Sequence, residues 1–174
     1  MQVTVGRRNR QRAYSGVVAE PPDADLVLAF LNTVDVEEHT DVLDDHRLWR
    51  AWLAERRLTA GDLGRVRAAR AALRGAVGDP DAAAAPDAAD TTVTVRLGPG
   101  GPELTSVDVI GAVLAAAVRL AERGDWGRVK ICPADDCRWA FYDLSRNRSR
   151  NWCSMRVCGN REKARAWRER TKAP

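Results

Sequence analysis

The chain has 174 residues, a formal net charge of +4, and 45% hydrophobic but only 6% aromatic residues. A chain of this length buries one good core plus a small appended module, so more than two units are excluded. No run of about eighteen apolar residues occurs, which excludes a membrane-spanning helix. Because alanine dominates the apolar residues, we expect a mainly α fold with a small β-hairpin.

The charge is distributed unevenly along the chain. Residues 138–174 contain eleven Arg or Lys against three acidic residues, and four arginines lie within the first fifteen residues. The segment between these two basic ends is therefore acidic. A basic end on an acidic body is typical of a protein that binds polyanions with that end.

Residues 1–22 are basic and close on Pro21 and Pro22, which predicts a disordered arm. Such an arm could follow phosphates, but a solvated tail is the simpler interpretation. No apolar segment with a small-residue cleavage site follows the basic residues, so we expect no signal peptide and a cytoplasmic protein.

A first helix is expected over Leu26–Val34, capped by Asp23 or Asp25. Asn32 lies within its apolar face. A buried amide needs hydrogen-bond partners, so Asn32 is either a structural cross-brace, which we favour, or a polar group lining a ligand pocket.

The next segment, residues 35–45, is acidic and is expected to be a solvated loop, although two histidines near it allow a metal site as a minor alternative. A helix is then expected over residues 46–57, with Trp49 and Trp52 on one apolar stripe. These tryptophans are either core residues or the wall of a small-molecule cavity.

A further helix is expected to begin at the N-cap Thr59, with Asp62 at its third position. Its basic face carries Arg65, Arg67, Arg70 and Arg74. Charged helical faces are ordinarily exposed, so we expect this face in solvent rather than on a nucleic acid.

Residues 78–90 form a low-complexity linker, and the alternating residues after it predict a β-hairpin with strands at Thr91–Leu97 and Glu103–Thr105. A helix over Val107–Arg123, capped by Ser106 or Thr105, is apolar nearly all round. Such a helix is either central or shared with a second subunit, so a homodimer through the helical domain is possible.

All four cysteines lie in the last third of the chain, at Cys132, Cys137, Cys153 and Cys158. Four residues separate the members of each pair and fifteen separate the pairs. Two short Cys turns deliver four thiolates to one ion at little loop-closure cost, as structural zinc requires. Two disulfides or scattered buried thiols are the alternatives, and the expected cytoplasmic location favours one structural Zn²⁺.

The segments CPADDC and FYDLSRNRSRNWCSMRVCGNREKARAWRER resemble the CGNR zinc-finger family, named for the tetrapeptide at residues 158–161. The segment LVLAFLNTVDV at residues 26–36 is similar to the start of the ABATE domain, which precedes the finger in that family. The resemblance implies zinc on the four cysteines, DNA binding, and a role as a stress-induced bacterial transcription regulator.

Around the cysteines, the sequence predicts a zinc knuckle on a hairpin formed by residues 129–131 and 139–142, then an arginine-rich loop and a final helix over Asn160–Thr171. Trp152 is expected to pack over the metal, and Ala164 with Trp167 to dock the helix on the finger. Guanidinium, amide and hydroxyl groups suit phosphate and base-edge contacts. The candidate DNA contacts are Arg146, Asn147, Arg148, Arg150, Arg161, Arg165, Arg168 and Lys172.

The expected organisation is therefore a basic arm (1–22), a helical ABATE-like domain (23–125) and a four-cysteine zinc finger (126–174). We favour a transcription regulator that binds double-stranded DNA; the alternative is a zinc-finger module that binds RNA or a protein. An enzyme is not expected, because four thiolates leave zinc no open position. The sequence identifies no small-molecule effector.

Overall fold

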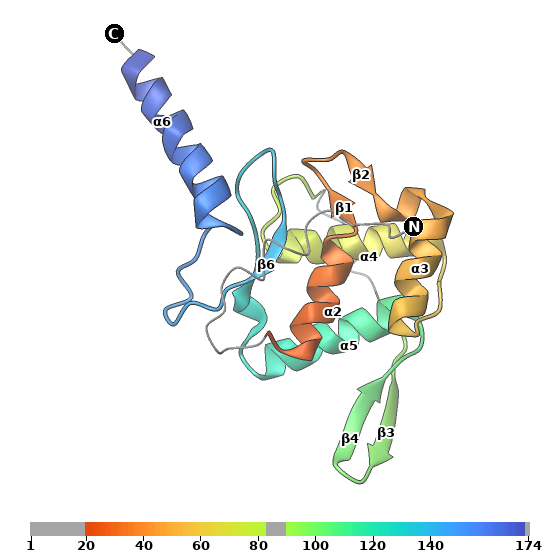
Figure 1. Cartoon of the computed structure of the whole chain (residues 1–174). Helices are drawn as coiled ribbons and strands as arrows, with labels where there is room; N and C mark the ends of the chain where they lie inside the picture. Colours follow the sequence, from red (N-terminus) through yellow and green to blue (C-terminus); the bar gives the residue numbers. More distant parts are fainter. Residues whose placement is uncertain (1–19, 83–89, 173–174) are drawn as a thin grey trace.

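The computed structural model describes residues 20–82 and 90–172, so most of the predicted arm and the middle of the predicted linker lie outside the described residues. Figure 1 shows several helices gathered into one body, from which a hairpin and a final helix project. The α-helices are α2 (Pro22–Leu31), α3 (His46–Arg56), α4 (Leu63–Ala76), α5 (Val109–Glu122) and α6 (Asn160–Lys172).

Within the described residues, the strands form three antiparallel pairs. These are β1 (Val34–Asp35) with β2 (Thr40–Asp41), β3 (Thr94–Gly98) with β4 (Gly101–Thr105), and β5 (Val129–Ile131) with β6 (Ala140–Tyr142). The mainly α fold with small hairpins is thus confirmed. The helices of this part of the chain include none that is both long and apolar enough to cross a bilayer.

Three helix starts differ from prediction, those of α2, α4 and α5. Helix α2 begins at Pro22, where the ring fixes a helical φ, and no side chain caps it. Helix α4 begins at Leu63 with Asp62 as N-cap, accepting a hydrogen bond from the Arg65 backbone N–H, and not at Thr59. Thr59 instead pairs with the residues that lead into α5, since its backbone N–H donates to the Val107 carbonyl (2.7 Å).

Helices α2 and α5 pack against each other, and Figure 1 shows them side by side in the body. Phe30 and Leu31 of α2 are fully buried, as are Val113 and Leu120 of α5. Asp108, rather than Ser106 or Thr105, caps α5, accepting hydrogen bonds from two backbone N–H groups. The predicted homodimer stays a prediction.

Two tryptophans of α3 belong to this core. The Trp49 and Trp52 rings stack with centroids 5.1 Å apart, and Trp52 lies 6.2 Å from the Phe30 ring. The core interpretation of Trp49 is therefore confirmed, because its side chain is buried among the helices.

The basic face of α4 is solvent-exposed only in part: Arg65 is exposed, as predicted, whereas Arg70 and Arg74 are buried, contrary to the prediction. Arg70 and Arg74 are 8% and 6% exposed. Arg70 donates to both carboxylate oxygens of Asp41 (2.7 and 2.5 Å), and Arg74 donates to Asp79 (2.6 Å). The paired carboxylates compensate the burial of each guanidinium.

Arg74 also ties three segments of the chain together. Its two terminal nitrogens donate to the Leu31 carbonyl at the end of α2 (2.9 Å) and to the Arg138 carbonyl beside the second cysteine (2.8 Å). Helix α4 therefore connects the helical body to the predicted zinc knuckle.

Asn32 is a cross-brace, as favoured from the sequence. Its amide nitrogen donates to the Ala140 carbonyl (2.9 Å), and its amide oxygen accepts from the Ala140 backbone N–H (2.8 Å). The side chain thus acts as a short extra strand beside β6. Four residues of β5 and β6 share the core of the helices: Val129, Ile131, Ala140 and Tyr142.

Candidate metal centre

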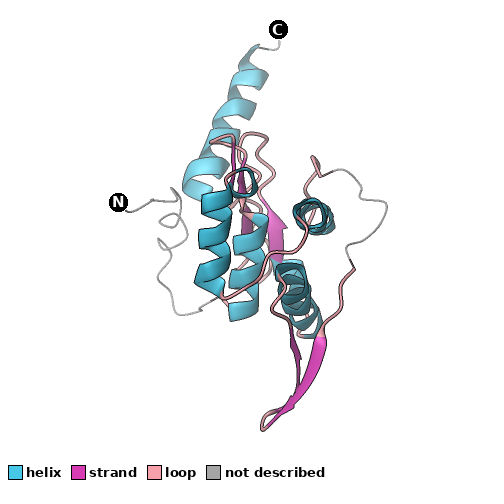
Figure 2. Ribbon diagram, turned by 90° about the vertical axis from the view of Figure 1, so that its right-hand side faces the viewer, coloured by secondary structure: helices cyan, strands magenta, loops and turns pink. Residues whose placement is uncertain are grey.

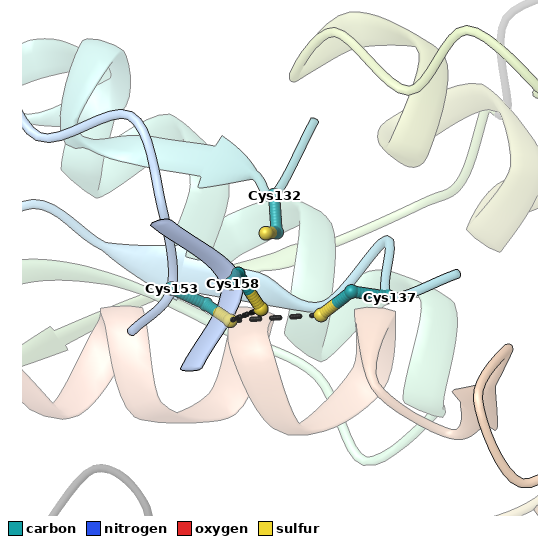
Figure 3. A group of neighbouring side chains, drawn as sticks. All are labelled: Cys132, Cys137, Cys153 and Cys158. Carbon is teal, nitrogen blue, oxygen red and sulfur yellow. Dashed lines mark hydrogen bonds between the residues drawn. The ribbon is translucent and has the colours of Figure 1, made fainter. Parts of the chain in front are cut away.

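The four cysteine side chains converge at one point, shown in Figure 3. Cys132 and Cys137 lie on either side of the β5–β6 turn, while Cys153 and Cys158 come from the segment before α6. Their sulfur atoms all lie within 4.8 Å of one another. Three of the four residues are fully buried or nearly so, and Cys153 is partly exposed.

The sulfur spacing fits a zinc ion and does not fit disulfides. Cys153 Sγ lies 3.6 Å from both Cys137 Sγ and Cys158 Sγ. Four sulfurs about 2.3 Å from one tetrahedral zinc are about 3.8 Å apart, whereas a disulfide bond is about 2.05 Å long. All four cysteines are free thiols. The cluster therefore suits one structural Zn²⁺, which would crosslink the two chain segments.

The thiols of the cluster differ in how readily they ionise. Burial, followed by the charges of Cys137 and Cys132, raises the pKa of Cys158 to about 12, and hydrogen bonding to Cys132 raises the pKa of Cys153. Hydrogen bonds from Cys132 and then Cys153 lower the pKa of Cys137. Thiols this close cannot all ionise unless a cation lies among them, so zinc binding must release protons.

The first cysteine pair is held by a tight turn. The backbone N–H groups of Cys137 and Arg138 both donate to the Ala134 carbonyl (2.9 and 3.2 Å). Arg138 has a φ of 50° and folds its guanidinium back over the turn, donating to Pro133 O (2.6 Å) and Asp135 (2.8 Å). This buried arginine thus closes the knuckle rather than facing a ligand.

The second pair is surrounded by side chains that fix its position. Trp152 and Trp139 pack against the cysteines, which confirms the packing role predicted for Trp152. Arg150 donates to the carbonyls of Trp152 (2.8 Å) and Cys153, and its guanidinium lies 5.0 Å from the Phe141 ring. Arg150, a predicted DNA contact, is therefore engaged within the finger.

Asp143 anchors the arginine-rich loop, a role that the sequence did not indicate. Its fully buried carboxylate accepts hydrogen bonds from Lys130 Nζ (2.7 Å) and from the backbone N–H groups of Ser145 (2.8 Å) and Arg150 (2.9 Å). Burial raises the pKa of Asp143, but hydrogen bonds from Lys130 and then Ser145 outweigh it and lower the pKa to about 2.

We expect Asp143→Asn to lower the free energy of unfolding by about 2–3 kcal/mol near pH 7, since the depressed pKa alone corresponds to about 2.5 kcal/mol. A carboxyl with a lowered folded-state pKa stabilises the fold above about pH 4 and loses this effect only as the pH falls toward about 2. The deficit, measured by urea unfolding with zinc present, should therefore be equal at about pH 7 and about pH 5.5.

The matched control is Asp44→Asn, which removes an exposed carboxylate paired with Arg67. An exposed pair contributes about 1 kcal/mol or less. An Asp143→Asn protein as stable as this control would contradict the anchoring role.

The anchored loop holds Arg146, Asn147 and Arg148 exposed to solvent. Lys130 Nζ also donates to the carbonyls of Arg148 (2.6 Å) and Arg150 (3.1 Å), so this lysine of β5 holds the loop backbone in place. Three predicted contact residues thus project from an anchored turn next to the metal centre.

The final helix has nearly the bounds predicted from the sequence, but it does not pack against the finger as predicted. Helix α6 projects away from the body in Figures 1 and 2, and within it no residue is buried. Trp167 is 62% exposed and Ala164 is exposed, so the predicted docking of these residues on the finger is wrong. The physical reason is that only the first turns of α6 lie near any other element.

Two of the predicted contact residues on α6 instead face the knuckle. Arg161 pairs with Asp136 (2.8 Å), lies 3.8 Å from Glu37 of the β1–β2 turn, and approaches Cys158 Sγ (3.7 Å). Arg165 pairs with Glu162 (3.3 Å) and lies 3.8 Å from Asp135 and 3.9 Å from Asp136. Arg168 and Lys172, farther along the same side, are exposed.

Comparison with known protein families agrees with this part of the structure. Residues 128–171 match the model of the CGNR zinc finger. The matched CGNR finger contains all four cysteines, the anchored loop and nearly all of α6. The match covers only this end of the chain, so the resemblance of residues 26–36 to the ABATE domain stays a prediction. A search of curated proteins found no match to the chain.

Sequence reasoning identified the four cysteines from their spacing but missed the residues that position them. Arg74 was expected in solvent, and Arg138 and Lys130 were given no part in positioning the cysteines. For Asp143, the one available signal is an isolated acid beside an arginine-rich loop.

Proposed function

We propose that this protein is a zinc-dependent, DNA-binding transcription regulator of bacterial type, acting in the cytoplasm, with its CGNR finger as the DNA-binding module. The observation that carries the proposal is the set of exposed cations in the loop, the segment and the helix that adjoin the last two cysteines in the chain. This set consists of Arg146, Arg148, Arg156, Lys163, Arg168, Arg170 and Lys172.

Positioning supports the proposal as much as charge does. The loop cations stand on a backbone fixed by Asp143 and Lys130, and α6 is fixed at its base through Arg161 and Asp136. A pre-positioned basic surface loses little conformational entropy when it binds the phosphate backbone. Zinc supplies the crosslink between the two parts and no reaction, since its four thiolate ligands leave no position for substrate.

In this proposal the helical body, residues 23–125, is an ABATE-like regulatory or dimerisation domain connected to stress response. We assign it no small-molecule effector. A cavity of about 250 Å³ lies beside α4 and is lined by Arg67, Arg70 and Arg74, but their guanidinium groups are already engaged by carboxylates.

The test is binding to a random-sequence DNA duplex across a salt series. Neutralisation of four to six phosphates predicts that affinity falls on the order of 10²–10³-fold between about 50 and about 200 mM salt. Arg146→Gln/Arg148→Gln should weaken binding and reduce the salt slope by about two.

The matched control is Arg47→Gln/Arg50→Gln, which removes two exposed arginines of α3 and equal charge. We expect it to bind like the wild type. Equal losses in both double variants would mean that the binding is non-specific attraction to net charge. Tighter binding to RNA or to acidic proteins than to duplex DNA would favour the alternative interaction module.

A further inference from the structure

The outward side of α6 carries an exposed tryptophan between two cations. Residues three and four apart on a helix share a face, and at 3.6 residues per turn Lys163, Trp167 and Arg170 fall within an arc of about 60°. All three are exposed. The glutamates of α6, Glu162 and Glu169, fall outside this arc.

This outward face lies opposite the side that holds α6 to the finger. Arg161 lies against Asp136, and Arg165 lies near Asp135. Around the helix axis, the outward face is roughly 190° from these two arginines, which places it on the opposite side of α6. Binding through Arg161 and Arg165 would first require breaking their ion pairs with the knuckle. Binding through the outward face requires no such rearrangement.

The aromatic side chain itself needs explanation. Trp167 stands where α6 projects from the body, so it contributes nothing to the core of the chain. Large aromatic residues exposed among cations are characteristic of surfaces that bind nucleic acids, because the ring packs on sugars or bases while the cations bind phosphates.

We propose that the outward face of α6, formed by Lys163, Trp167 and Arg170, is the face that enters the major groove of duplex DNA. Lys163 and Arg170 are about 10 Å apart along the helix axis, about one turn on either side of Trp167, and their long side chains reach the phosphates that border the groove. Trp167 then faces the base edges, where its indole N–H donates to acceptors of the groove. This assignment rests on the proposed function.

Two kinds of variant test the proposal, with binding to a random-sequence duplex pool as the readout. Lys163→Gln/Arg170→Gln should lower affinity and reduce the salt slope by about two. Trp167→Ala should weaken binding about tenfold with the slope unchanged, and Trp167→Phe, which keeps an aromatic ring but loses the N–H donor, should recover only part of that loss. Because these side chains are exposed, zinc content and helix content should equal those of the wild type.

The comparison with Arg47→Gln/Arg50→Gln on α3 separates a local effect from a change in net charge. Wild-type binding that survives both outward-face variants would overturn the assignment of this face while leaving the proposed function intact. Absence of duplex binding by the wild-type protein would overturn both. If Trp167→Ala instead dissociates a dimer in sedimentation and leaves DNA affinity unchanged, the face is an interface between copies and the proposal is wrong.

Discussion

Cys153→Ser should abolish zinc retention and unfold the C-terminal end of the chain. The hydroxyl is a poor zinc ligand, and structural zinc typically contributes about 10–16 kcal/mol of apparent binding free energy to a small domain. No residue of α6 is buried, so this helix has little else to hold it once the Cys158 segment is released. The variant should therefore lose stoichiometric zinc.

The loss of order should be graded along the finger. Residues 153–172 should lose hydrogen-exchange protection, because the zinc holds them to the knuckle, whereas the loop that Asp143 and Lys130 anchor should keep it. Strands β5 and β6 should keep protection, because Asn32 and the helical core hold them independently of the metal. Ser149→Ala, which truncates an exposed hydroxyl in the loop before α6, is the control and should keep one zinc per chain. A Cys153→Ser protein with full zinc content would refute the assignment of four cysteine ligands.

Arg74→Met should be the most damaging single substitution outside the finger. It leaves the carboxylate of Asp79 buried without its cation and removes the donors to the Leu31 and Arg138 carbonyls. Breaking a buried pair by removing one partner typically costs about 3–5 kcal/mol. Chemical denaturation with zinc present measures this loss.

Arg65→Met on the same helix is the matched control. Its guanidinium lies 3.5 Å from a fully exposed Asp90 carboxylate, and such a pair is worth about 1 kcal/mol or less. Arg74→Met/Asp79→Leu should recover part of the lost stability, because the stranded charge is removed as well. Equal effects of Arg65→Met and Arg74→Met would show that Arg74 does not connect α4 to α2 and the knuckle.

The metal centre was predictable because its information is local. The two Cys pairs have equal spacing within short segments, so the prediction of four ligands for one ion depends little on the rest of the chain. The family match and the sulfur distances agree with that interpretation. The helices α3 and α6 were likewise predicted nearly to the residue from their periodicity.

The errors concern partners that arrive from distant segments. Arg70 and Arg74 are buried because Asp41 and Asp79 reach them, and helical periodicity alone contains no sign of those carboxylates. The partner of Asn32 lies 108 residues away, so the sequence predicted a brace but not what it braces. Trp167 was expected to pack because tryptophans usually do. In the structure it lies on the part of α6 that projects from the body, so its side chain is exposed.

Together these contacts make the zinc end an extension of the helical body rather than a loosely attached module. The knuckle is bonded to α2 through Asn32 and to α4 through Arg74.

The central claim is that zinc organises the end of this chain that we propose to bind DNA. The most direct test is duplex DNA affinity at fixed salt for three samples of the full chain: as purified, after zinc removal by a chelator, and after zinc is restored. We predict salt-sensitive binding that is lost on zinc removal and recovered when one equivalent of zinc is returned. Unchanged duplex affinity in the zinc-free protein would contradict the account.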